Sequence, residues 1–353
     1  MKGKPKILYV YAFNSSFIRK DKELLERNFD LVPLFFNPLP RWKTPFSLLT
    51  QGFQILFNLR RTKAIVCQFA GFHTVLPVLI GKLSRTKTSI ILLGAECHNY
   101  PGIQHGNFRK KGLALATKIS FKYASQLLPI DDSLVNFENN YDDSEPKNQG
   151  FIGLLPGLST EHQVIPHGFD SAIFRPAEQL NHSNSFITVS SSVAPPVFQR
   201  KGIDLILKTA PLFPQCTFTI LCKNDYLVES ELPNNVKLLQ AVSYEKLPEI
   251  LSAHRFYLQI SIAEGLPNAL CEAMLCGCIP IGSNVFAIPY IIENTGFIVK
   301  KRTVEALAHQ LKLALESNHK KELSEAARKR IIEKFPLELR IEKLPIAILN
   351  KPA

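Results

Sequence analysis

Two glutamates eight residues apart, Glu264 and Glu272, flank a segment whose sequence predicts a turn and then a helix. The apolar run that ends near Ser261 predicts a strand. Pro267 fits the first position of a helix, where the missing proline N–H would be unpaired in any case, and Gly277 fits a left-handed helix end. Unpaired N–H groups at a helix start, together with the helix dipole, favour an anion. The segment therefore predicts a site for a diphosphate or for sugar hydroxyls.

The two carboxylates are expected to have different neighbours. Glu264 lies in the predicted turn and can face a cleft, whereas Glu272 lies on the second helical turn, where it can accept hydrogen bonds from both hydroxyls of a ribose. A solvated helix face is the alternative interpretation. A buried carboxylate is costly unless it binds something, which favours a site. The ligand would be surrounded by the predicted helix start: Gly265, Leu266, Pro267 and Asn268.

Three segments, in this order along the chain, resemble the retaining family-4 glycosyltransferases. VIPHGFDSAIFRP, from Val164, resembles the interdomain segment of that family, with His167 in place of its usual asparagine. QRKGIDLIL, from Gln199, resembles its lysine-glycine helix start, and EGLPNALCEAMLCGCIPIGSN, from Glu264, resembles its nucleotide-sugar motif. The resemblance is firm over roughly residues 160–300 and weaker before residue 130 or so.

The resemblance implies an α/β protein of GT-B architecture, in which two Rossmann-like domains face a central cleft. It implies that Glu272 binds the ribose of a nucleotide-sugar donor, that Glu264 contacts the donor sugar and that Lys201 neutralises the diphosphate. Arg200 is a further candidate for donor binding. No metal or cofactor is implied, because lysine and helix amides would offset the charge of the leaving diphosphate.

The sequence departs from the family pattern in the second half. The stretch before Lys201 lacks the usual arginine, and Arg200 is the nearest substitute, although adjacent side chains at a helix start should point apart. After the predicted strand Ile279–Ile281, Phe286 and Ala287 stand in a loop that normally carries two glycines, which predicts a narrower site.

In the first half, the family places a polar residue near the reacting carbon, in the loop after the strand that corresponds here to Thr88–Leu93. Glu96 and His98 are the catalytic candidates in this loop. The alternative for His98 is a histidine that is only structurally bonded.

Short apolar runs alternate with helix-like segments along the whole chain, and this alternation predicts parallel sheets wound with helices. The predicted divisions are an acceptor-side domain at 1–167, a nucleotide-sugar-binding domain at 168–335 and a tail at 336–353 that packs back on the first domain. Ligands are expected at the carboxyl ends of the strands.

The net charge of +12 is concentrated at the start of the chain, where residues 1–122 hold 20 Lys/Arg against 5 Asp/Glu. Within this part, residues 41–63 predict either a helix in a membrane interface or a core-facing helix with basic ends. No apolar run is long enough to cross a bilayer. The seven cysteines lack paired spacing and predict reduced core residues. We expect a cytoplasmic protein with peripheral contact to an anionic membrane face.

The combined prediction is a retaining glycosyltransferase that moves a sugar from a UDP- or GDP-sugar to a glycan or lipid-linked acceptor in cell-surface polysaccharide synthesis. A catalytically degenerate nucleotide-sugar-binding protein is the main alternative. A sugar epimerase would not explain the lysine-glycine and glutamate segments in this order. Nucleic acid is not an expected partner, because basic charge alone favours it and no helix-turn-helix, RNP motif or zinc knuckle accompanies that charge.

Overall fold

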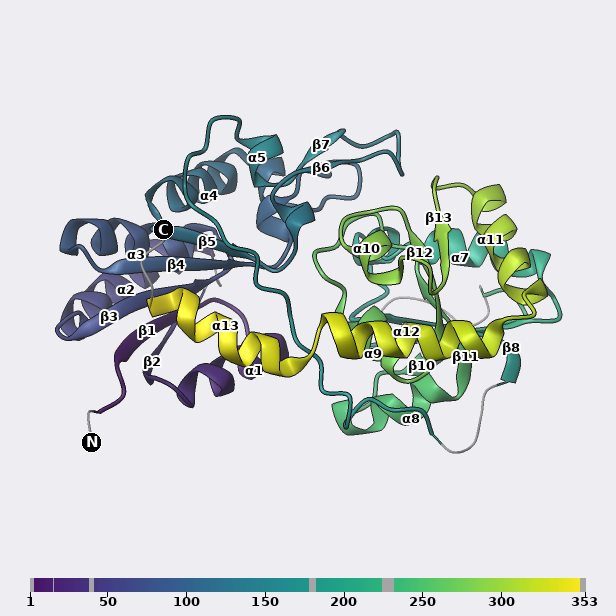
Figure 1. Cartoon of the computed structure of the whole chain (residues 1–353). Coiled ribbons are helices and arrows are strands. Elements are labelled where there is room, and N and C mark those ends of the chain that lie inside the picture. Colours follow the sequence, from purple (N-terminus) through teal and green to yellow (C-terminus); the bar gives the residue numbers. More distant parts are fainter. Residues whose placement is uncertain (1–2, 15, 38–40, 178–181, 224–231, 350–353) are drawn as a thin grey trace.

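Two parallel sheets, each covered by helices, lie one after the other in the computed structural model of the chain (Figure 1). The structure describes residues 3–14, 16–37, 41–177, 182–223 and 232–349. None of the helices in these ranges combines the length and the hydropathy that a membrane span requires.

The first sheet has the strand order β2-β1-β3-β4-β5, with all neighbouring strands parallel. Its central strands carry long runs of buried apolar residues, as expected for a sheet covered on both faces. The strands are β1 Lys6–Tyr11, β2 Asp30–Phe35, β3 Thr62–Gln68, β4 Lys87–Leu92 and β5 Gln126–Pro129. The helices are α1 Ser16–Glu26, α2 Thr44–Asn58, α3 Phe72–Ser84, α4 Lys111–Tyr123 and the short α5 Phe151–Leu154. A small antiparallel hairpin joins β6 Phe137–Glu138 to β7 Asn148–Gln149.

The second sheet has the order β10-β9-β8-β11-β12-β13 and is also parallel. Counted from its own first strand, this is the 3-2-1-4-5-6 order of a dinucleotide-binding sheet. The strands are β8 His182–Ser190, β9 Thr217–Cys222, β10 Val236–Gln240, β11 His254–Gln259, β12 Ile279–Ser283 and β13 Phe297–Val299. The helices are α6 Val197–Arg200, α7 Ile203–Thr209, α8 Leu247–Ser252, α9 Asn268–Leu275, α10 Ile288–Ile292, α11 Val304–Glu316 and α12 Lys320–Lys334.

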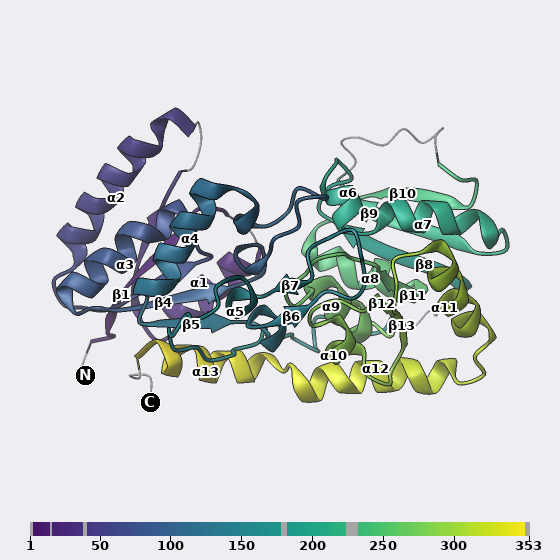
Figure 2. The same ribbon diagram turned by 90° about the horizontal axis from the view of Figure 1, so that it is seen from above.

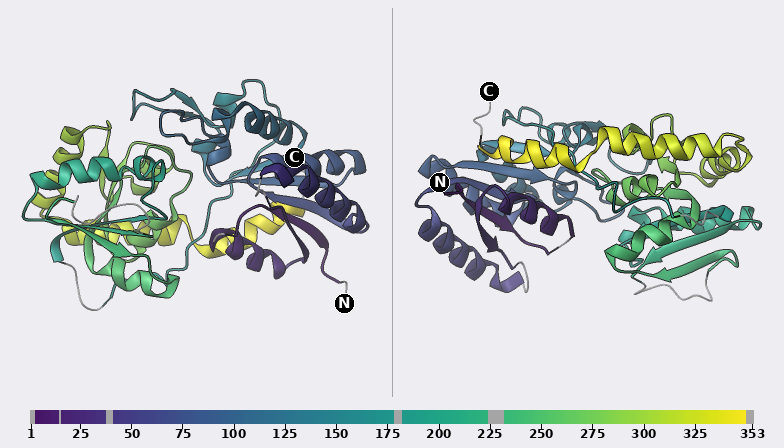
Figure 3. Two further views of the ribbon diagram at one scale, coloured as in Figure 1. Left: turned by 180° about the vertical axis from the view of Figure 1, so that it is seen from behind. Right: turned by 60° about the horizontal axis from the view of Figure 1, so that its bottom comes forward.

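The chain passes between the two domains twice, and the two connecting segments lie side by side. They are joined by a hydrogen bond of 2.9 Å from the Phe169 N–H of the first segment to the Phe335 carbonyl of the second. After the second crossing, α13 (Leu337–Leu349) runs back along the first domain (Figures 2 and 3). The Ala347 carbonyl accepts hydrogen bonds from Lys87 and Gln126 there.

The same helix is held by a buried ion pair. Arg340 bonds both carboxylate oxygens of Asp21 on α1, each at 2.7 Å, and the side chains of both residues are only 3% exposed. Pro345 lies inside this helix. Residues 350–353 of the predicted tail lie outside the described residues.

The seven cysteines are all buried and none of them forms a disulfide, in line with the prediction of reduced core residues. They lie in the sheets and in the helices and loops that pack on them, so they contribute to the core as small apolar side chains.

Candidate functional site

The segments after β8 and β11 meet where the strand order of the second sheet reverses. Such a reversal opens a crevice at the carboxyl ends of the strands. The lysine-glycine pair follows β8, and Gly202 has a positive φ of 70°. A Cβ on Gly202 would lie 2.0 Å from the Ile260 carbonyl oxygen. Only glycine therefore allows Lys201 to lie so close to the end of β11.

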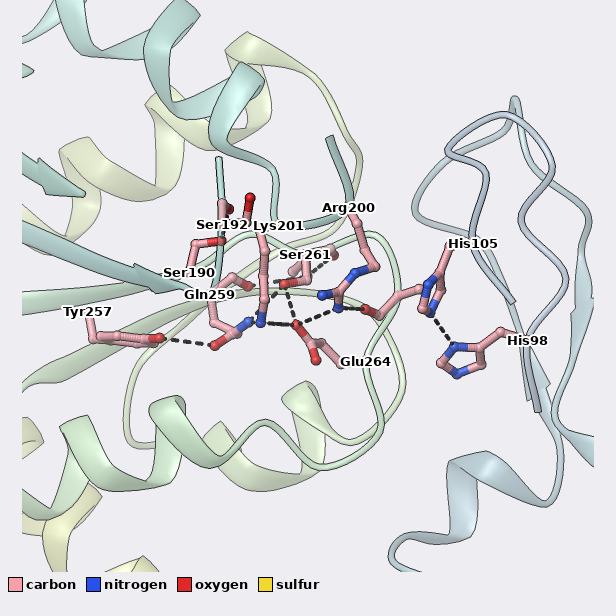
Figure 4. A network of polar contacts seen from close by, with 12 residues as sticks. His98, His105, Ser190, Ser192, Arg200, Lys201, Tyr257, Gln259, Ser261 and Glu264 are labelled. Atoms are coloured by element: carbon pink, nitrogen blue, oxygen red, sulfur yellow. Dashed lines mark hydrogen bonds and ion pairs between the residues drawn. The ribbon is translucent and has the colours of Figure 1, made fainter. Parts of the chain in front are cut away.

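Glu264 is the centre of a polar network at this point (Figure 4). One of its oxygens, Oε1, lies 2.6 Å from the Lys201 Nζ and 2.8 Å from the Ser261 Oγ. Gln259 Nε2 donates to the same oxygen at 3.2 Å, and Arg200 lies 3.7 Å away. The structure thus brings Glu264 together with both cations.

Arg200 does not point away from Lys201, contrary to the sequence-based expectation. That expectation assumed that both residues lie in one helix. Instead α6 ends at Arg200 and α7 begins at Ile203, with the left-handed Gly202 between them. The bend lets both side chains reach Glu264, so Arg200 can provide a second cation close to that of Lys201.

The charges at this centre change the ionisation of its members. Burial alone would raise the pKa of Glu264. The positive charges of Lys201 and Arg200 outweigh this effect of burial and lower the pKa of Glu264 to about 2. Burial lowers the pKa of Lys201, and the carboxylate of Glu264 opposes that change. The protein therefore holds a buried ion pair beside the crevice near neutral pH.

Helix α9 begins one residue later than predicted. Asn268 is its first residue, and Pro267 is the extended N-cap with φ −73° and ψ 108°. Gly277 has the predicted left-handed conformation, with φ 86°. The N–H groups of the first turn have no partners within the helix, and the Asn268 side-chain oxygen is buried without a hydrogen bond to the described residues. The N–H groups of the helix start can therefore bind an anion, and the Asn268 oxygen can accept a hydrogen bond from a ligand hydroxyl.

Glu272 lies one turn further along α9 and is buried. Burial raises the pKa of Glu272, while the Lys20 ammonium and a hydrogen bond with Tyr244 oppose that change. Lys20 is on α1 of the first domain, and its Nζ lies 2.6 Å from the Tyr244 hydroxyl and 3.9 Å from the Glu272 carboxylate. Neither Lys20 nor Tyr244 could be predicted from the sequence, because no motif relates residues 224 positions apart.

A cavity of about 470 Å³ adjoins this cluster between the domains. Its volume falls in the usual range for a small-molecule site. Its walls include Lys20, Tyr244, Asn268 and, on the hinge side, His167 and Arg340. Burial and then the nearby Arg340 lower the pKa of His167 to about 3.

The loop after β4 forms the opposite wall of the centre. A Cβ on Gly265 would lie 2.1 Å from the Leu93 carbonyl oxygen, so glycine allows the two domains to touch here. His98 is buried against the Glu264 backbone, and its Nδ1 lies 3.1 Å from the His105 Nε2. Burial lowers the pKa of both rings, that of His105 to about 3. The structure thus brings neutral His98 to the centre.

Glu96 is placed differently. Its carboxylate is fully buried and accepts a hydrogen bond from the Leu93 backbone N–H at 2.6 Å. Burial raises its pKa to about 7. We assign Glu96 to the turn that carries His98, and we do not place it among the groups that face a substrate.

Phe286 fills the space beside His98 from the second domain. Its ring centroid lies 4.4 Å from that of His98 and 4.3 Å from that of Phe137 in β6, with the two phenyl rings stacked. The residue has a φ of 44°, which is unusual for a bulky side chain. The loop that was expected to narrow the cleft therefore joins the two domains by aromatic packing.

Residues 178–330 match the family described as "Glycosyl transferases group 1". Among characterised proteins, a phosphatidylinositol N-acetylglucosaminyltransferase chain of Arabidopsis thaliana is 25% identical over 174 residues, which is 46% of this chain and 38% of that protein. The human protein of the same name is 26% identical over 43% of this chain and 33% of its own length. The chain thus matches little more than a third of these relatives.

A further relative is an Escherichia coli galactosyltransferase named for UDP-Gal and α-D-GlcNAc-diphosphoundecaprenol, 24% identical over 51% of this chain and 52% of that protein. Among solved structures, sucrose-phosphate synthase of Thermosynechococcus elongatus has a TM-score of 0.76 at 14% identity, covering 98% of both chains. Anabaena HepE in complex with UDP has a TM-score of 0.70 at 14% identity, covering 97% of this chain and 99% of that one. These neighbours confirm the expected GT-B fold.

Proposed function

Because residues 178–330 match the group 1 glycosyl transferases within a GT-B fold, we propose that this protein is a retaining glycosyltransferase using a nucleotide-diphosphate sugar. The observation that carries the proposal is the crevice at the end of β8 and β11. Two cations, Arg200 and Lys201, lie there beside Glu264, and helix α9, which carries Glu272, begins a few residues further on. This arrangement suits a ligand with an anionic centre, a ribose and a sugar.

Each part of the donor has a proposed partner. The diphosphate lies between the two cations and the first turn of α9, which together offset its charge without a metal ion. The ribose hydroxyls donate hydrogen bonds to Glu272 and replace its contacts with Tyr244 and Lys20. Once Lys201 turns to the diphosphate, Glu264 can accept hydrogen bonds from the donor sugar, with His98 on the opposite side. UDP and GDP are the proposed nucleotides, and UDP is the one bound in HepE.

The proposed reaction is a displacement on one face of the sugar. The acceptor oxygen bonds to C1 as the bond from C1 to the phosphate oxygen breaks, and the hydroxyl proton passes to that leaving oxygen. Glu264 holds sugar hydroxyls and forms no covalent intermediate. Buried cations and amides around a leaving diphosphate stabilise its charge most when water is excluded.

The acceptor is proposed from the relatives' names. One is named for phosphatidylinositol and another for a diphosphoundecaprenol-linked sugar. We propose a glycan or lipid-linked acceptor in cell-surface polysaccharide synthesis, used at the cytoplasmic face of a membrane.

A thermal-shift screen of UDP, GDP and ADP, with and without their sugars and in the presence of EDTA, tests the donor site. A ligand at 100 times its Kd stabilises the folded state by about 2.7 kcal/mol, which corresponds to a rise in Tm of roughly 5–10 °C. We expect the nucleotides of one base to give this shift, and we expect Glu272→Gln to reduce it by about half or more. A protein that no nucleotide stabilises would contradict the proposed site.

A catalytically inert nucleotide-sugar binder is the second candidate, because Phe286 occupies space between the domains. Slow release of nucleoside diphosphate from the donor distinguishes the two. An active transferase hydrolyses its donor slowly and loses this reaction in Glu264→Ala, whereas an inert binder shows the same thermal shift with no release in either form.

A further inference from the structure

An apolar stripe runs along the outer side of α2. The inner side of this helix packs on α3, where Gln51 and Ile55 are buried and Gln51 donates to the His73 carbonyl. The outer side, together with the 3₁₀ turn Arg41–Lys43 that precedes the helix, carries large apolar side chains that are 58% to 89% exposed: Trp42, Phe46, Leu49, Phe53, Leu56 and Phe57. Spacings of three and four residues place most of them on one helix face. A helix that is apolar on its solvent side needs a partner there.

The part of the chain that contains the stripe is almost entirely positive in charge. Residues 41–130 contain thirteen Lys/Arg and a single Asp/Glu, and that one acid, Glu96, is buried. Lys43 and Arg60 lie exposed at the two ends of the stripe. The Lys43 ammonium lies 5.1 Å from the centre of the Trp42 ring. A partner must therefore be apolar where it meets the helix and anionic around it.

The position of α2 leaves the stripe accessible. Figures 1 and 2 both place this helix at the outer edge of the first domain, away from the second domain. Its 15 residues form a rod of roughly 22 Å. A flat surface can contact its full length without touching the candidate site.

We propose that the stripe on α2 docks on a bilayer that contains anionic phospholipids, with the helix lying in the plane of the interface. Its apolar side chains enter the boundary between headgroups and acyl chains, and Lys43 and Arg60 contact the phosphates. A second copy of the chain fits less well, because two such basic surfaces repel each other. A nucleic acid would leave Leu49 and Leu56 without apolar contacts. Docking would bring the protein to a lipid-linked acceptor in the bilayer, and that consequence rests on the proposed function. The docking itself requires no nucleotide.

The chain contains its own reporter of docking. Trp42 is its single tryptophan and is 69% exposed at one end of the stripe. The test mixes the full chain, without nucleotide, with vesicles of phosphatidylcholine alone or with phosphatidylglycerol. It records flotation with the vesicles and the emission wavelength of Trp42. We expect flotation and a blue shift with phosphatidylglycerol vesicles, and both should weaken as salt is raised.

Two double variants separate the contributions. Phe53→Ser/Phe57→Ser removes apolar contacts and Lys43→Glu/Arg60→Glu reverses the charge, and we expect each to weaken binding by at least about tenfold. The matched control is Leu313→Ser/Ile332→Ser, which removes exposed apolar side chains of the second domain and should bind vesicles like the wild type.

Three results would overturn the proposal. The first is wild-type protein that does not float with anionic vesicles. The second is a doubling of mass with a Trp42 blue shift in the absence of lipid, which would identify a second copy as the partner. The third is salt-sensitive binding of a random oligonucleotide that exceeds vesicle binding. Nucleotide-induced thermal shifts of the same variants should match those of the wild type, so a failure of docking and a failure of the donor site can be told apart.

Discussion

Replacement of Lys201 by methionine should leave Glu264 as a poorly compensated charge in the crevice. The Lys201 Nζ lies 2.6 Å from the Glu264 carboxylate, and the two side chains are 14% and 11% exposed. Methionine retains most of the length of lysine but lacks its charge. The Arg200 guanidinium remains at 3.7 Å and compensates only in part.

The size of the effect follows from the pKa of Glu264. Its pKa falls from an ordinary 4.5 to about 2 in the folded chain. Because each unit of change in pKa corresponds to about 1.36 kcal/mol, folding favours the charged form of Glu264 by roughly 3 kcal/mol. Because this pKa is lowered, the stabilisation is present above about pH 4.5 and is lost as the pH falls towards 2. We expect Lys201→Met to destabilise the second domain by about 2–3 kcal/mol near neutral pH.

Urea unfolding of a double-mutant cycle measures this coupling. The partner change is Glu264→Gln, which alone leaves the lysine unpaired. In Lys201→Met/Glu264→Gln neither charge remains, so we expect the double variant to recover at least half of the summed losses. Losses that simply add, or a Lys201→Met variant within about 0.5 kcal/mol of wild type, would refute the assignment of a buried, coupled pair.

Three other substitutions have outcomes that follow from the geometry. Arg340→Met should lower the free energy of unfolding in urea by about 3–5 kcal/mol, because it leaves the buried Asp21 carboxylate without its cation; an unchanged midpoint would be inconsistent with that pair. Glu272→Gln should weaken nucleotide binding at least about tenfold in calorimetry, with an unchanged circular dichroism spectrum, and equal affinity would remove Glu272 from the site. Phe286→Ala should speed hydrogen exchange in the β6–β7 hairpin, because the ring of Phe137 loses its stacking partner; unchanged exchange would show that the ring does not hold the domains.

Much of the fold could be predicted from local patterns. The strand Thr217–Cys222 and the helix Lys320–Lys334 are examples, because an apolar run dominates the first and helix-forming residues dominate the second. The β6–β7 hairpin and the three-residue β13 were not predicted, since such short strands depend on neighbours distant in sequence. Pro345 lies within α13, whose buried contacts with the first domain outweigh the loss of one backbone hydrogen bond.

The candidate site was predictable where one short segment forms it. Glu264, Glu272 and the start of α9 follow from a single strand, turn and helix. Lys20 could not be found in this way, because its contact with Tyr244 exists only when two domains meet. Glu96 and His98 lie in the same predicted loop, and the sequence alone does not distinguish them. In the structure the Glu96 carboxylate accepts a hydrogen bond from the Leu93 N–H and so binds its own loop.

Isothermal titration calorimetry in EDTA tests the central claim most directly, by comparing a nucleoside diphosphate with its monophosphate. If the two cations and the start of α9 bind the diphosphate, the nucleotides of one base should bind. The nucleoside diphosphate of that base should bind at least about tenfold more tightly than its monophosphate. Lys201→Met should remove most of that difference. Equal affinity of the two nucleotides, or a difference that survives in Lys201→Met, would contradict the account.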